Sequence, residues 1–302
     1  MAAFVHRREF LRQGAALSSA AAATFLPRIG FAEDAAATGD ARYKFSLAAY
    51  SYRSLLQGKD APLTLADFID DCAKMKLDGT ELTSYYFPTP VTREFLMARK
   101  EQCERLGLEV SGTAVGNDFA HPAGEKREQQ IAHVKSWVDH AETMGAPVIR
   151  IFAGHVQKEQ SPEEAHKLIV AAIEECCDYA GQHGVKLALE NHGGPTATAE
   201  GLLKIVQDVK SPHFGVNLDT GNFHGDRIYE ELAEAAPHAI NVQVKVVVSG
   251  PDRKKRPADF GRIAKILRDA EYQGYVVLEY EEAGDPREEC PKYVEQMRAA
   301  FG

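Results

Sequence analysis

Cysteine is scarce in this 302-residue sequence, and its five copies show no sign of a disulfide framework or a zinc site. Their number is odd, no Cys-x-x-Cys pair occurs, and no Cys/His spacing suits zinc. We therefore interpret each cysteine as a small apolar residue of the interior. Reduced thiols fit a protein that folds in the cytoplasm. The positions are Cys72, Cys103, Cys176, Cys177 and Cys290.

Long hydrophobic runs are also missing. The longest apolar stretch near the N-terminus, 14–26, has about 13 residues, whereas a membrane span needs roughly 20. It follows Arg7 and Arg8 and precedes the small residues Gly30 to Ala32, which is the basic, apolar, small order of a signal peptide. The paired arginines predict the twin-arginine export route, hence a periplasmic or otherwise exported protein. We predict a signal peptide at 1–32 and a flexible lead-in at 33–42, with an uncleaved membrane anchor as the alternative.

Positive charge is in short supply. The sequence has 35 Lys and Arg against 44 Asp and Glu, a net charge of −9. Removing 1–32 would take away four basic residues and one acidic one, so the net charge would become −12. Such a surface disfavours a nucleic-acid partner. One basic run, 253–256, follows the seventh predicted strand, and we interpret it as a solvated loop rather than a binding patch.

Short β-rich runs alternate with amphipathic stretches of helical spacing along the rest of the chain. Eight such repeats predict a single (β/α)8 TIM barrel over 43–302, near the roughly 250 residues typical of that fold. An open doubly wound sheet is the alternative, but it favours a Gly-rich phosphate loop after the first strand, and residues 50–53 offer none. The predicted strands are 44–52, 79–86, 108–115, 147–153, 186–191, 214–220, 240–248 and 275–280. The predicted helices are 65–76, 93–106, 126–144, 162–183, 199–209, 229–236, 260–270 and 291–300.

Alternation within the predicted strands separates two faces, because successive side chains point to opposite sides and the side toward the helices must be apolar. In the fifth strand, Leu187 and Leu189 face the helices, so Glu190 faces the barrel axis. The other strands follow the same rule. The polar residues that it turns toward the axis are Arg150, Glu190, His192, Asn217, Asp219, Gln243, Lys245 and Glu279.

Three of these residues, Glu190, Asp219 and Glu279, are carboxylates near the C-terminal ends of their strands. Carboxylates gathered in one apolar-walled mouth repel each other unless a positive charge lies among them. We therefore predict one divalent metal ion, and oxygen ligands favour Mn, Mg or Co, with Zn as the alternative. Each acid alone is as well explained by a helix N-cap or a salt bridge. Their coincidence on nearby strands favours the metal.

Four short motifs lie at the last four predicted strands in order, at 189–192, 217–221, 242–245 and 278–281. From Lys44 to its end the chain resembles the xylose isomerase-like TIM-barrel superfamily, which includes ketose 3-epimerases, inosose dehydratases and endonuclease IV. The resemblance implies four metal ligands. The chain departs from the pattern where Gln243 replaces the commoner His and Val246 replaces a frequent Asp. The implied ligands are Glu190, Asp219, Gln243 and Glu279.

The resemblance implies a metal-dependent isomerase or epimerase acting on a small carbohydrate through an enediolate. Glu190 and Glu279 would be its catalytic acid/base pair. His192 and Lys245 are candidates to bind substrate hydroxyls, although His192 also suits an orienting role behind the metal ligands.

Two further residues are candidates to bind substrate. Arg150 would bind an acidic or phosphorylated group, or else form a structural ion pair. His224 lies near a predicted strand end, where it would line the pocket.

Other functions remain open for the same site. Metal-assisted elimination or hydration on 3-keto-sugars or glycosides begins with the same proton abstraction, and a non-catalytic sugar-binding barrel is a rival of another class. DNA repair is disfavoured, because Asn222 stands where the endonuclease branch has a His and because the chain is acidic. The sequence leaves the oligomeric state open, a homo-oligomer included.

Overall fold

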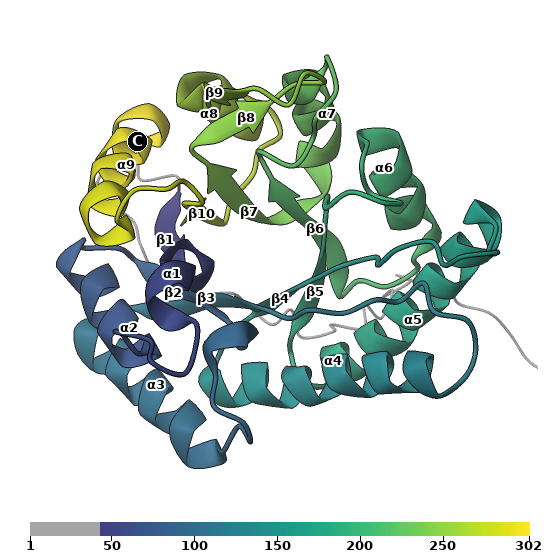
Figure 1. Ribbon diagram of the computed structural model, residues 1–302, viewed down its shortest axis with the longest axis horizontal. Coiled ribbons are helices and arrows are strands. Elements are labelled where there is room, and N and C mark those ends of the chain that lie inside the picture. The colour runs from purple at the N-terminus through teal and green to yellow at the C-terminus, as the bar shows by residue number, and fades with distance from the viewer. Residues whose placement is uncertain (1–42) are drawn as a thin grey trace, which may run out of the picture. The chain divides into compact units, whose positions relative to one another are not determined.

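The computed structural model describes residues 43–302, and within them eight parallel strands close into a barrel surrounded by helices (Figure 1). The predicted (β/α)8 fold is confirmed. The predicted signal peptide and lead-in lie outside the described residues. Around the barrel the order is β1-β10-β7-β6-β5-β4-β3-β2. The barrel strands are β1 (Lys44–Ala48), β2 (Gly79–Thr83), β3 (Glu109–Ala114), β4 (Val148–Ile151), β5 (Lys186–Glu190), β6 (Phe214–Asp219), β7 (Ala239–Lys245) and β10 (Tyr275–Glu279).

Local signals in the sequence explain where the surrounding helices begin and end. Thr64 accepts a hydrogen bond from the Asp67 N–H, and the Asp67 carboxylate accepts one from the Thr64 N–H, which closes a capping box on α2. The C-terminal end of α3 shows a second signal, because Gly107 adopts a left-handed conformation (φ 72°) that favours glycine. The helices are α1 (Arg53–Leu56), α2 (Leu65–Lys74), α3 (Arg93–Leu106), α4 (Glu125–Met144), α5 (Pro162–Gln182), α6 (Ala199–Asp208), α7 (Ile228–Ala235), α8 (Phe260–Asp269) and α9 (Pro286–Phe301).

The two faces of each strand meet different surroundings. Leu187 and Leu189 of β5 are fully buried in the apolar layer that joins the barrel to its helices. On the inner side, the Gln243 amide of β7 donates to Glu81 of β2, although β10 and β1 separate these two strands around the barrel. This hydrogen bond therefore crosses the barrel interior, and it confirms the predicted inward direction of Gln243.

Several boundaries differ from the sequence-based prediction. The seventh strand, predicted to reach residue 248, ends at Lys245, and a separate antiparallel hairpin of β8 (Val247–Ser249) and β9 (Lys255–Pro257) follows. Half of the basic run 253–256 thus belongs to β9, and all four of its residues are exposed. The sequence did not predict this break, because the valines at 246–248 continue the apolar run and alternation alone does not mark where a strand leaves the barrel.

The last helix also begins earlier than predicted, at Pro286 rather than at Pro291. Asp285 caps it by accepting a hydrogen bond from the Arg287 N–H. Proline is tolerated in a first helical turn, where an N–H would have no helical partner. Pro291 therefore lies inside the helix and does not mark its start.

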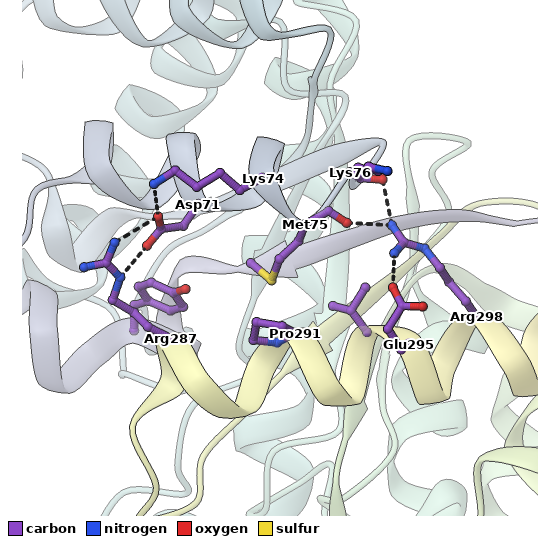
Figure 2. Close-up of a pocket in the computed structure, with 10 residues that line it drawn as sticks. Asp71, Lys74, Met75, Lys76, Arg287, Pro291, Glu295 and Arg298 are labelled. Carbon is purple, nitrogen blue, oxygen red and sulfur yellow. Dashed lines mark hydrogen bonds and ion pairs between the residues drawn. The ribbon is translucent and has the colours of Figure 1, made fainter.

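The first and last long helices, α2 and α9, border a surface groove with a cavity of about 470 Å³ (Figure 2). Arg287 Nε lies 2.8 Å from Asp71 Oδ2 at one end. At the other end, Arg298 Nη2 donates to the Met75 and Lys76 carbonyls at 2.8 and 2.7 Å. These contacts tie the two ends of the described chain together, and none of the predicted site residues lines the groove.

The five cysteines are buried and carry free thiols, as interpreted from their pattern. Within residues 43–302, no helix has both the length and the apolar character needed to cross a membrane.

Candidate active site

Four charged side chains occupy the last residues of four barrel strands. Glu190 ends β5, Asp219 ends β6, Lys245 ends β7 and Glu279 ends β10. Lys245 pairs in register with Glu279, and all four residues are less than 10% exposed. The parallel strands thus bring the predicted carboxylates together at one end of the barrel, together with a lysine.

Lys245 lies among three carboxylates. Its Nζ donates a hydrogen bond to Glu279 Oε2, and it lies 3.2 Å from Asp219 Oδ2 and 3.0 Å from Glu281 Oε1. Burial alone would lower the pKa of this ammonium, but the surrounding carboxylates outweigh it and hold the pKa well above its ordinary value. Lys245 is therefore a fixed positive charge at the barrel mouth.

The path of the Lys245 side chain is set by β6 and the residues that follow it. The Lys245 N–H donates to Thr220 Oγ1 at 2.9 Å. A Cβ added at Gly221 would lie 2.6 Å from Lys245 Cγ, so only glycine leaves room for the lysine stem.

Arg150 of β4 forms the second buried ion pair of the mouth. Its Nε lies 3.0 Å from Glu190 Oε2, and both side chains are at most 6% exposed. The guanidinium also lies over the Phe152 ring, 4.0 Å from its centroid. Asn222 donates to the other oxygen, Glu190 Oε1, at 2.8 Å. Both oxygens of Glu190 are thus contacted.

Gln243 belongs to a layer deeper in the barrel. Its amide donates to Glu81 Oε1 at 2.6 Å, and its carbonyl oxygen accepts from Asn217 at 2.7 Å. Asn241 donates to Glu81 Oε2 at 2.9 Å and to Asn217 Oδ1 at 2.7 Å. Burial raises the pKa of Glu81 to about 7, although Asn241 and Gln243 favour its ionised form. These four residues form a hydrogen-bonded floor beneath the ion pairs.

The two glutamates of the predicted acid/base pair have pKa values displaced in opposite directions. Burial raises the pKa of Glu190 well above its ordinary value, despite the opposing charge of Arg150. Burial also acts to raise the pKa of Glu279, but the charge and hydrogen bond of Lys245 outweigh it, and the pKa is lowered. Such a difference suits one group to hold a proton and the other to accept one.

A cavity of about 250 Å³ opens beside Lys245 and Glu279. His224 also lines it, and its Nδ1 lies 3.1 Å from the Ser249 carbonyl oxygen. His192 is an exposed residue whose ring packs on Phe152 with 4.4 Å between the ring centroids, and it does not line this cavity. The candidate substrate residues therefore fall into two groups, Lys245 with His224 and Arg150 with His192.

Residues 69–299 match the family model described as "Xylose isomerase-like TIM barrel". The chain belongs to this family. No curated protein matches its sequence significantly.

Solved structures of the same barrel fold include three enzymes whose sequences are under 20% identical to this chain, so the likeness shows the fold. D-Psicose 3-epimerase from Clostridium cellulolyticum H10 is 16% identical, with a TM-score of 0.71 over 85% of this chain and 99% of its own. 3-Keto-D-glucoside 4-epimerase from E. coli is 16% identical, with a TM-score of 0.67 over 85% and 99%. A probable 3-DHS dehydratase from Bacillus anthracis is 18% identical, with a TM-score of 0.63 over 85% and 97%.

The side chains of this family member do not fit the divalent metal that its resemblance implies. Within residues 43–302 no three His, Cys, Asp or Glu side chains are grouped so as to hold a metal ion. The Lys245 ammonium lies between Asp219 and Glu279, and the Gln243 oxygen accepts from Asn217 instead of pointing toward them. The metal and its four ligands stay predictions.

Two side chains of the barrel mouth were missed by sequence reasoning. Glu281 contacts Lys245, and Asn222 donates to Glu190. Glu281 was within reach of the alternation rule, since it follows Glu279 by two residues and closes the motif 278–281. No local signal marked Asn222 as a partner of Glu190, because Glu190 ends β5 whereas Asn222 lies in the connection that follows β6.

Proposed function

We propose that this xylose isomerase-like barrel is a sugar isomerase or epimerase that moves a proton on the carbon next to a carbonyl group. The observation that carries the proposal is the buried pair of glutamates at strand ends, with the pKa of Glu190 raised and that of Glu279 lowered. Strands β6 and β7 separate them around the barrel, so they approach a bound sugar from different sides.

In the proposed reaction, the ionised Glu279 removes the proton from the carbon next to the carbonyl. The electron pair of that C–H bond forms the C=C bond of an enediolate, and the carbonyl oxygen takes the negative charge. Glu190, whose pKa is raised, delivers a proton to the opposite face in an epimerisation or to the neighbouring carbon in an isomerisation. Arg150 and Asn222 fix the orientation of Glu190.

A divalent metal remains a prediction of the family resemblance. The substrate class is supported by the fold shared with enzymes named as epimerases of D-psicose and of a 3-keto-D-glucoside.

Elimination on a 3-keto-sugar is the second candidate. A buried Glu190 with a raised pKa can donate its proton to a leaving group as readily as to carbon. The shared fold with a probable dehydratase supports the same chemistry. Only the fate of the enediolate distinguishes this reaction from epimerisation.

Proton NMR in D₂O tests the proposal. The protein is incubated with free ketoses and with 3-keto-glycosides, and deuterium uptake and new products are followed. Uptake with interconversion of epimers or isomers supports the proposal, and release of an aglycone supports elimination. Absence of exchange with every sugar would favour a non-catalytic sugar-binding barrel.

Matched variants assign the two glutamates. Glu190→Gln and Glu279→Gln should each slow exchange by about 100-fold or more, since a positioned acid or base contributes roughly 10²–10⁴ in rate. Glu295→Gln, on the exposed side of α9, should leave the rate unchanged. Retained exchange in both site variants would refute the assignment.

A further inference from the structure

The position between Asp219 and Glu279 already holds a cation, the ammonium group of Lys245. Its contacts come from three segments: β6 through Asp219, β10 through Glu279, and the loop after β10 through Glu281. The ammonium donates a hydrogen bond to Glu279 and lies within ion-pair distance of Asp219 Oδ2 and Glu281 Oε1. The Lys245 side chain is only 9% exposed, so water contributes little to its surroundings.

The neighbouring backbone is built around the lysine stem. Gly221 leaves space that a Cβ would fill, 2.6 Å from Lys245 Cγ, and Thr220 Oγ1 accepts the Lys245 N–H. These contacts fix the stem independently of the carboxylates. Packing of the stem and attraction by the carboxylates therefore both position the Lys245 ammonium.

The remaining donor atoms of the predicted metal site are engaged elsewhere. Asp219 Oδ1 accepts from the Gly221 N–H at 2.8 Å, and both Glu190 oxygens are contacted by Arg150 and Asn222. The Gln243 oxygen accepts from Asn217 in the barrel floor. A divalent ion would have to displace these partners and lie beside the like charge of Lys245, and both requirements oppose binding.

We propose that Lys245 is the resident cation of this site and replaces the divalent metal that the family resemblance implies. In the reaction, its ammonium donates a hydrogen bond to the enediolate oxygen as negative charge develops there, and no proton leaves the nitrogen. This chemical role rests on the proposed function. The assignment of the cation itself does not, because metal binding is measured without a substrate.

Metal binding to the full-length protein decides the assignment. After dialysis against EDTA, the protein is titrated with Mn²⁺ by calorimetry, and its melting temperature is measured with and without 1 mM Mn²⁺. We expect no stoichiometric binding and a shift below 1 °C. Binding of one Mn²⁺ with a Kd below about 10 µM, with a matching rise in melting temperature, would overturn the proposal.

A second comparison removes the charge and keeps the stem. Lys245→Met leaves three carboxylates without their cation, so it should melt lower than the parent and be stabilised by Mn²⁺, by 3 °C or more. Lys265→Met, on the exposed face of α8, should match the parent in both measurements. If Lys245→Met and the parent have the same melting temperature, and Mn²⁺ changes neither, the result would count against the proposal. If Lys245→Met does not fold, the parent titration alone decides.

Exchange measurements separate the two proposals. If the parent protein keeps its full rate of deuterium exchange in EDTA, both proposals are supported. If the exchange is lost in EDTA and returns with Mn²⁺, the isomerase is supported and the role of Lys245 is overturned. If the parent exchanges no sugar, the proposed function fails and the Mn²⁺ titration still judges the cation.

Discussion

The buried ion pair between Arg150 and Glu190 is the clearest case of one side chain depending on another. Removing one partner of such a pair leaves an uncompensated charge in the interior, which costs about 3 kcal/mol or more. Arg150→Met should therefore destabilise the fold by about 3 kcal/mol, measured by urea unfolding. The double variant with Glu190→Gln should recover most of this loss. A double variant as unstable as the sum of both single changes would contradict the coupling.

Glu81 predicts a dependence of stability on pH. Burial raises its pKa in the folded protein to about 7, so the folded state keeps a proton that the unfolded chain releases near its ordinary pKa of 4.5. The folded state thus binds more protons across that window, and stability falls as pH rises from about 4.5 to 7, by at most about 3 kcal/mol.

Glu81→Gln should remove this contribution. The stability of the variant relative to the parent should rise between pH 5 and pH 8, whatever constant loss follows from the changed hydrogen bond with Gln243 or Asn241. Urea unfolding at several pH values measures the difference. A difference that does not change with pH would show that the Glu81 pKa is not raised.

At the scale of elements, the C-terminal end of α2 depends on a side chain from α9. Arg298 donates to the Met75 and Lys76 carbonyls, just where Lys76 adopts a left-handed conformation with φ 54° (Figure 2). A cation that satisfies the last carbonyls of a helix is stabilising. Arg298→Met should therefore cost about 1–2 kcal/mol.

Arg262→Met on α8 is the matched control. Its partner Glu230 and Arg262 itself are about half exposed, so their ion pair should contribute less than about 0.5 kcal/mol. Thermal and urea unfolding of both variants would test the comparison. Equal losses would show that Arg298 acts only as a surface charge.

The strands themselves were largely predictable, and their ends were not. Period-two alternation placed Glu190, Asp219 and Glu279 on inner faces because that pattern is local. It did not find the break after Lys245, since Val246 to Val248 continue the apolar run and only the β8–β9 pairing distinguishes them. The boundaries that failed depend on partners elsewhere in the chain.

For the molecule as a whole, the N-terminal segment carries a prediction of its own. If 1–32 is a twin-arginine signal, replacing Arg7 and Arg8 by lysine should retain the protein in the cytoplasm as an unprocessed chain. Fractionation and mass spectrometry of the exported protein test this, with Arg12→Lys as the control. Export unaffected by the double replacement would refute the twin-arginine route.

The sequence by itself determined the alternation of strands and helices and the positions of three carboxylates at strand ends. Both follow from residue periodicities that act over a few neighbours. Only the tertiary structure decided what those carboxylates contact. Lys245 reaches Glu279 across 34 residues, and Gln243 reaches Glu81 across 162. Such pairings depend on barrel closure and strand register, which place distant side chains at the same level along the barrel axis. For this reason Lys245 lies at the mouth and Gln243 in the floor.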